Sequence, residues 1–146
     1  MDIIIFSKDR AFQLYTSLET IQKHVSNIDN IYVQFAYSDK KYLDGYEKLN
    51  KIFNDVTFID ETVHGFQNTM YALLHSEIQS ENVMLEVDDT IYYKDLDLKK
   101  CNNILNQNSN AGKYGFGFDY TIFNNSYFID HGTHLSVNRS NTYDRE

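Results

Sequence analysis

Three carboxylates stand close together in residues 82–90, at the end of a short apolar run. The run has the length of a buried strand, in which residues i and i+2 project to the same face. Glu86 and Asp88 could therefore bind one divalent cation, with Asp89 turned into the space beyond the strand end. Carboxylate oxygens suit Mg²⁺ or Mn²⁺, and such a cation is commonly shared with substrate phosphates.

The same cluster has a purely structural interpretation. Asp88 or Asp89 could cap the following turn while the other carboxylates stay solvated. The two interpretations differ for the metal-free protein, because adjacent carboxylates without a cation repel each other. A metal site therefore predicts that removing one of these charges does not destabilise the metal-free fold, whereas a cap predicts a loss.

Composition and charge narrow the class of protein. The chain has 146 residues, is 42% hydrophobic and carries a formal net charge of −8. It is long enough for one hydrophobic core, so we predict a single domain over residues 1–146. The negative charge argues against a nucleic-acid partner, which would require clustered Lys and Arg. A phosphate-bearing ligand would then need a metal ion as intermediary.

The only cysteine is Cys101, so the sequence allows no internal disulfide and no cysteine-based zinc site. We expect a buried thiol in a helix. The apolar run at residues 3–6 is too short for a signal peptide, and no segment approaches the roughly 20 apolar residues of a membrane span. These features predict a protein without a transmembrane segment, located in the reducing cytoplasm.

Four apolar runs alternate with segments of helical periodicity. The alternation predicts a three-layer α/β/α sandwich with a mostly parallel sheet. Ligands of such sheets bind at the carboxyl ends of the strands, where polar clusters follow each predicted strand. The predicted strands are 3–6, 31–36, 56–59 and 83–87, the predicted helices are 11–25, 42–53, 66–78 and about 98–105, and later strands are predicted at 114–118 and 127–129.

The order of these clusters resembles the nucleotide-binding half of GT-A-type glycosyltransferases, the family 2-like group. Residues 3–10, IIIFSKDR, and the helix start after them are similar to the opening strand, loop and first helix of that family. Residues 86–89, EVDD, are similar to its metal-binding D-x-D motif, here in an E-x-D-D form. The resemblance covers about residues 2–97.

The resemblance implies transfer of a sugar from a nucleotide diphosphate sugar to a hydroxyl of a glycan or another acceptor. It also implies Mn²⁺ or Mg²⁺ as cofactor, to stabilise the diphosphate leaving group. Asp39 is expected to accept the ring N–H of the base. The implied metal ligands are Asp88, Asp89, Glu86 and His131. The implied nucleotide-sugar contacts are Phe6, Ser7, Asp9, Arg10, Ser38, Asp39, His64 and Asp88.

The chain departs from the family pattern in two places. Residues 69–72, TMYA, stand where the family often carries Ala-Arg-Asn. The region after the acidic cluster, which normally supplies the general base, is short. Asp119 and Asp130 are the available carboxylates there, and Asp130 is the stronger candidate because His131 follows it. The acceptor-binding half is therefore expected to be truncated.

Other functions remain compatible with a parallel α/β fold. A GT-A-like domain without its acceptor half would be a nucleotide- or partner-binding protein. Nucleotidyl transfer to a sugar phosphate usually relies on a glycine-rich basic loop after the first strand, and residues 7–10 contain no glycine. A Rossmann dehydrogenase is excluded because no G-x-G-x-x-G follows that strand.

Overall fold

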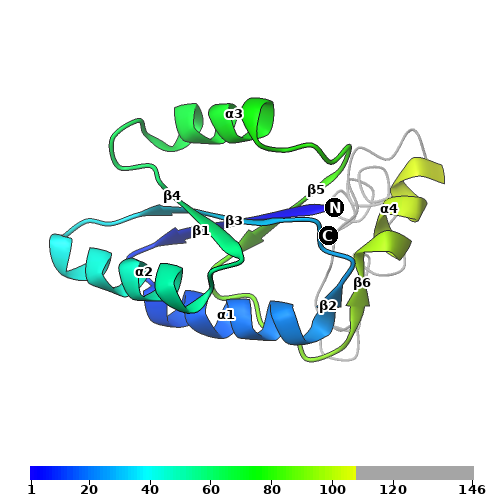
Figure 1. The fold of residues 1–146 in the computed structure, drawn as a ribbon, viewed down its shortest axis with the longest axis horizontal. Helices are drawn as coiled ribbons and strands as arrows, with labels where there is room; N and C mark the ends of the chain where they lie inside the picture. Colours follow the sequence, from blue (N-terminus) through cyan, green and yellow to red (C-terminus); the bar gives the residue numbers. More distant parts are fainter. Residues whose placement is uncertain (108–146) are drawn as a thin grey trace, which may run out of the picture. The chain divides into compact units, whose positions relative to one another are not determined.

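A computed structural model describes residues 1–107 (Figure 1). Residues 1–98 make one compact unit, and α4 beyond Leu98 belongs to a second. The strands predicted at 114–118 and 127–129 lie outside the described residues, and a single domain over residues 1–146 stays a prediction. The elements are β1 (Asp2–Lys8), α1 (Ala11–His24), β2 (Val25–Ser26), β3 (Ile31–Ala36), α2 (Lys40–Ile52), β4 (Val56–Asp60), α3 (Phe66–Ser76), β5 (Val83–Val87), β6 (Leu96–Asp97) and α4 (Leu98–Gln107).

The main sheet has the strand order β4-β3-β1-β5, and each neighbouring pair is parallel. This confirms the predicted topology. The first helix ends at His24 and not at Val25, because Val25 begins β2, which pairs in parallel with β6. This second sheet was not predicted, since strands of two residues are too short to produce a periodic pattern.

Side chains alternate along β1 and so divide the interior into two layers. Ile3 and Ile5 belong to the core cluster formed with α1 and α2. Ile4 instead packs with Tyr32 of β3 and Leu73 of α3. Figure 1 shows α1 and α2 on one face of the sheet and α3 on the other. The unit is therefore a three-layer α/β/α sandwich, as predicted.

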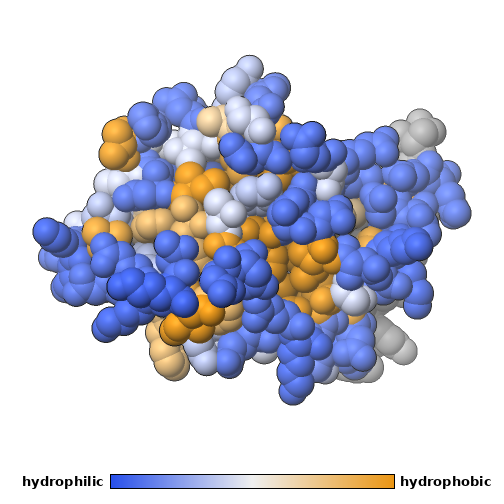
Figure 2. Space-filling model, in the orientation of Figure 1, coloured by the Kyte–Doolittle hydropathy of each residue, from blue (hydrophilic) through white to orange (hydrophobic). Residues whose placement is uncertain are grey.

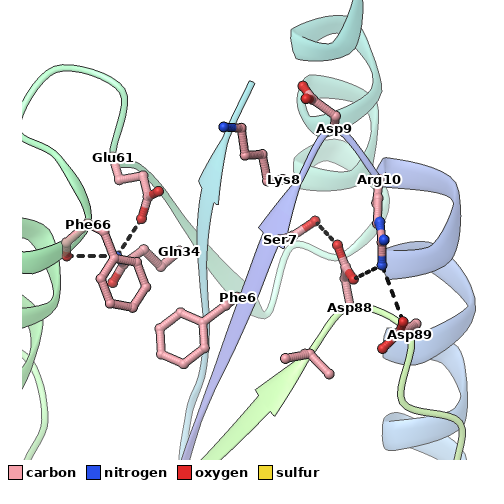
Figure 3. A pocket seen from close by; sticks show the side chains of 11 residues that line it. Phe6, Ser7, Lys8, Asp9, Arg10, Gln34, Glu61, Phe66, Asp88 and Asp89 are labelled. Carbon is pink, nitrogen blue, oxygen red and sulfur yellow. Dashed lines mark hydrogen bonds and ion pairs between the residues drawn. The ribbon is translucent and has the colours of Figure 1, made fainter. Parts of the chain in front are cut away.

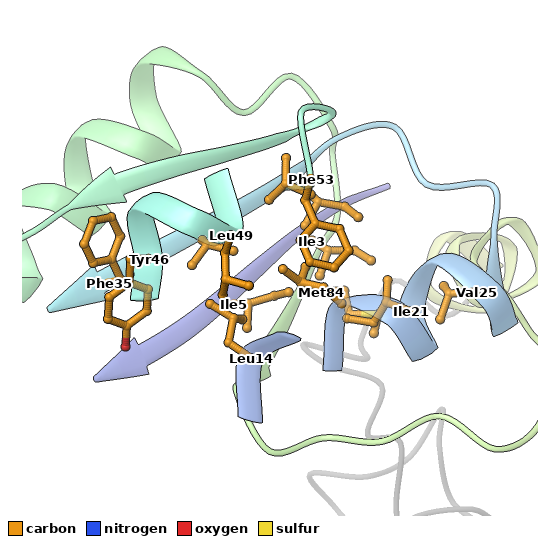
Figure 4. Close-up of a cluster of buried hydrophobic side chains, with 14 of the residues drawn as sticks. Ile3, Ile5, Leu14, Ile21, Val25, Phe35, Tyr46, Leu49, Phe53 and Met84 are labelled. Carbon is orange, nitrogen blue, oxygen red and sulfur yellow. The ribbon is translucent and has the colours of Figure 1, made fainter. Parts of the chain in front are cut away.

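The larger core lies between the sheet and α1 with α2 (Figure 4). Leu14, Leu18 and Ile21 of α1 are fully buried there, at the i, i+4, i+7 spacing of one helix face. Burying each such side chain contributes about 1.5–3 kcal/mol. Cys101 is a buried free thiol in α4, as expected. Within residues 1–107, every helix is too short or too polar to cross a membrane.

Gly45 allows α2 to lie close to the first turn of α1. A Cβ at position 45 would lie 2.6 Å from the Cβ of Ala11. We expect Gly45→Ala to lower the free energy of unfolding by about 1 kcal/mol, because overpacking costs about 1–3 kcal/mol and exceeds a helix-propensity gain of about 1 kcal/mol. Urea denaturation would measure the loss.

The double variant Ala11→Gly with Gly45→Ala tests the reason for that loss. If the two methyl groups clash, its destabilisation should be smaller than the sum of the two single effects. A Gly45→Ala protein more stable than the parent would contradict the close contact.

Candidate functional site

A cleft opens at the carboxyl ends of the strands, beside β1 and β5. The chain passes from β1 to β3 on one side of β1 and reaches β5 on the other. Such a change of direction in the strand order is where parallel sheets commonly bind ligands. The cleft has a volume of about 670 Å³ and is lined by Phe6, Ser7, Lys8, Asp9, Arg10, Gln34, Glu61, Phe66, Val87, Asp88 and Asp89 (Figure 3).

Two carboxylates converge on one guanidinium in this cleft. Asp88 is only 4% exposed, and its Oδ1 lies 3.5 Å from Nη1 of Arg10. Asp89 is exposed, and its Oδ2 lies 3.2 Å from the same nitrogen. The pair therefore already holds one positive charge between its oxygens.

Arg10 supplies the counter-charge for the two aspartates. Its guanidinium offsets the repulsion that neighbouring carboxylates would otherwise suffer. The side chain of Arg10 is 53% exposed, so these ion pairs add little to stability. Among the described residues only its Nη1 is engaged, which leaves the other N–H donors of the guanidinium for an anion in the cleft.

A chain of hydrogen bonds leads from the backbone into Asp88. The N–H of Arg10 donates to Oη of Tyr46 at 3.1 Å, and Oη of Tyr46 lies 2.8 Å from Oγ of Ser7. Ser7 donates to Oδ2 of Asp88 at 2.8 Å. Because a carboxylate only accepts hydrogen bonds, the hydroxyl of Ser7 donates its one hydrogen to Asp88. The oxygen of Ser7 must then accept the hydrogen bond from the hydroxyl of Tyr46. Burial raises the pKa of the Tyr46 phenol, so it keeps the proton that this chain needs.

The loop after β1 is held by Asp9, which has a left-handed φ of 60°. Its Oδ1 accepts from the backbone N–H of Ser38 at 2.7 Å, and this bond lowers the pKa of the Asp9 carboxyl. Asp9 therefore ties the β1–α1 loop to the β3–α2 loop. Helix α1 begins after Arg10 without a side-chain cap, so its first N–H groups are suited to an anion.

The other end of the cleft is aromatic and amide-lined. Phe6 lies on the face of β1 opposite to Ser7, and its ring centroid lies 5.2 Å from that of Phe66. Gln34 is 1% exposed in β3. Its Nε2 donates to Oε2 of Glu61 at 2.5 Å and to the carbonyl of Phe66 at 3.0 Å. The two ends of the cleft therefore differ in chemistry because side chains alternate along β1.

Several residues expected at the site do not line the cleft. Oε1 of Glu86 accepts from the hydroxyl of Tyr92 at 2.6 Å, so the structure does not bring Glu86 to Asp88 as a joint ligand. Asp39 caps α2 through the N–H of Lys41. The structure likewise leaves Ser38 and His64 out of the cleft lining, although Ser38 contacts Asp9.

Only some of the predicted metal ligands lie within the described residues. Within residues 1–107, no three His, Cys, Asp or Glu side chains are grouped so that they could hold a metal ion. The predicted base Asp130 and the predicted ligand His131 lie outside this range. Of the expected metal ligands, Asp88 and Asp89 lie together in the cleft.

Gln34, Phe66 and Tyr46 were not predicted as site residues, whereas Glu61 belongs to a polar cluster predicted at this edge of the sheet. Gln34 carried a usable signal, because an amide in an otherwise apolar, buried strand needs polar partners. Tyr46 lies in the helix predicted over residues 42–53, and it is 1% exposed. The role of its hydroxyl could not be predicted, since the partners are 36 and 39 residues away in the chain.

The parallel sheet flanked by helices, with its cleft at the carboxyl edge, fits a glycosyltransferase fold. In sequence, the chain is 37% identical over 122 residues to the bifunctional glycosyltransferase pgtA of Dictyostelium discoideum. The match covers 78% of this chain but 15% of that protein, so the chain is related to part of a glycosyltransferase. No family model matches the chain, and no solved structure matches it.

Proposed function

We propose that this chain is the nucleotide-binding part of a GT-A-type glycosyltransferase. It would transfer a sugar from a nucleotide diphosphate sugar to a hydroxyl of a glycan or another acceptor. The observation that carries the proposal is the convergence of Asp88 and Asp89 on one cationic group at the carboxyl edge of the sheet. The similarity to pgtA supports glycosyl transfer in general.

Asp88 and Asp89 are the residues that would hold Mn²⁺ or Mg²⁺. Their oxygens lie 3.5 and 3.2 Å from Nη1 of Arg10, and carboxylate oxygens are ligands that suit both ions. Two carboxylates suffice for an ion that completes its coordination with phosphate oxygens and water. The bound ion would act as a Lewis acid on the leaving diphosphate.

The chain's own residues would bind and orient the donor. In the transfer, the bond between the anomeric carbon and the diphosphate oxygen breaks, and the acceptor oxygen forms a bond to that carbon. The acceptor proton passes to a base, for which Asp130 is the candidate. Arg10 and the first N–H groups of α1 would meet the negative charge of the diphosphate. Ser7 and Tyr46 would hold the carboxylate of Asp88 in place.

We expect Mn²⁺ or Mg²⁺ together with a nucleoside diphosphate to raise the melting temperature of the chain. A ligand at 100 times its Kd stabilises the native state by about 2.7 kcal/mol. The metal should be required, because the net charge of −8 otherwise repels a diphosphate. A thermal-shift panel with uridine, guanosine, cytidine and thymidine diphosphates would test this.

Each nucleotide in the panel is measured with cation and with a chelator. Free nucleosides serve as the control that lacks the diphosphate. If no nucleotide shifts the melting temperature with either cation, nucleotide binding is removed from the proposal.

A further inference from the structure

The end of the cleft away from Arg10 offers hydrogen-bond acceptors beside two aromatic rings (Figure 3). Glu61 is the charged member of this end. Its backbone N–H donates to the carbonyl of Phe35 at 2.9 Å, and its Oε2 accepts from Gln34 at 2.5 Å. Within the described residues its Oε1 has no hydrogen-bond partner. Glu61 is therefore held in place with one carboxylate oxygen left to accept from a ligand.

Gln34 cannot supply a donor to the same ligand. Both groups next to its Nε2 are acceptors, the Glu61 carboxylate and the Phe66 carbonyl, so the amide orientation is set by its partners and its two N–H groups are used. Its buried Oε1 has no partner among residues 1–107. At this end of the cleft, Gln34 and Glu61 therefore offer a ligand hydrogen-bond acceptors and no donors.

We propose that Glu61 reads the nucleobase of the donor by accepting a hydrogen bond from a ring N–H. This inference rests on the proposed function and assigns the base end of the nucleotide. Uracil and guanine carry a ring N–H on the edge that pairs with other bases. Cytosine and adenine carry a lone pair at that ring position, which would face the carboxylate. The rings of Phe6 and Phe66 offer an apolar surface for the flat base.

The expected preference follows from the asymmetry of this contact. A charge-assisted hydrogen bond forms with one group of bases, and two acceptors oppose each other with the other group. With Mn²⁺ present, UDP or GDP should therefore bind the full chain at least about 10-fold more tightly than both CDP and ADP. Asp39 does not line the cleft, and its Oδ1 caps α2.

Isothermal titration of Glu61→Gln with the four diphosphates and Mn²⁺ tests the assignment. The preferred nucleotide should lose about 10-fold in affinity, while CDP and ADP should not weaken, because the substitution removes the carboxylate that opposes their ring lone pair. Asp60→Asn is the matched control, because Asp60 is an exposed neighbour whose carboxylate accepts from the N–H of Thr62 and does not line the cleft. It should leave all four affinities unchanged.

The nucleotide preference of the parent chain keeps the test decisive if Glu61→Gln does not fold. Phe66 is 49% exposed, and Phe66→Ala should weaken all four nucleotides without changing their order. If the parent chain binds no nucleotide at all, the proposed function and this inference both fail. If it binds nucleotides but prefers CDP or ADP, or if Glu61→Gln keeps the parent's preference, only this inference is overturned.

Discussion

Asp88→Asn should abolish the metal-dependent response to nucleoside diphosphates. The substitution removes the buried carboxylate of the pair that would hold the cation, and asparagine offers the metal one neutral oxygen in its place. With Mn²⁺ and a saturating nucleotide, the stabilisation of about 2.7 kcal/mol expected for the parent should fall to near zero. Thermal shift and titration of Mn²⁺ would measure the loss.

The metal-free Asp88→Asn protein separates the functional from the structural interpretation. Asparagine keeps an acceptor for Ser7, and the lost ion pair involves a half-exposed Arg10, so we expect a change in unfolding free energy within about 1 kcal/mol. Glu86→Gln removes the same charge two residues earlier, in β5 and outside the cleft. It should keep the full ligand response. An Asp88→Asn protein that is destabilised yet still responds to metal and nucleotide would favour a purely structural role.

Tyr46→Phe should lower the free energy of unfolding by about 1–3 kcal/mol. The change leaves the N–H of Arg10 without its acceptor and Ser7 without its donor, both next to the buried carboxylate of Asp88. The ring itself stays stacked on Phe35 at 4.4 Å, so the loss reports the hydroxyl and not the packing. Chemical denaturation at neutral pH measures it.

Tyr37→Phe is the matched control, because its ring also stacks on Phe35 and no hydrogen bond of its hydroxyl is found among the described residues. Tyr37→Phe should leave the free energy of unfolding nearly unchanged.

Burial raises the pKa of Tyr46 above its usual 10.0. The contribution of its hydroxyl to the free energy of unfolding is therefore complete below pH 10.0, and it is lost as pH rises through the pKa of the folded protein. The difference between parent and Tyr46→Phe should therefore shrink at strongly alkaline pH. Equal stability of the two proteins at pH 7 would show that the chain of hydrogen bonds is not needed.

Burial alone does not distinguish a functional carboxylate in this fold. Asp2 is fully buried at the amino end of β1, opposite the cleft. It accepts from Asn30 at 2.7 Å and from the N–H of Ser80 at 3.3 Å, which are neutral donors. Asp88 differs because it faces a guanidinium and an open cleft. The surroundings of a carboxylate, and not its exposure, therefore separate a structural role from a binding role.

Hydrophobic and polar patterning predicted the elements, their parallel arrangement and the edge of the sheet at which the cleft lies. Hydrophobic periodicity reports which face of a segment is buried, and right-handed crossovers then restrict the topology. Because parallel strands end at one edge, the clusters after β1 and β5 could be placed together without coordinates. Phe6, Ser7, Asp9, Arg10, Asp88 and Asp89 all line the cleft as this reasoning expected.

Which polar side chains contact each other could be read only from the three-dimensional structure. Ser7 and Asp88 are 81 residues apart in the chain, and Gln34 and Glu61 are 27 apart. Their contacts depend on strand register and on how far each helix stands from the sheet, which hydrophobic periodicity does not encode. Asp39 and Glu86 were predicted at the site but do not line the cleft. Their carboxylates accept from partners nearby in the chain, the N–H of Lys41 and the hydroxyl of Tyr92.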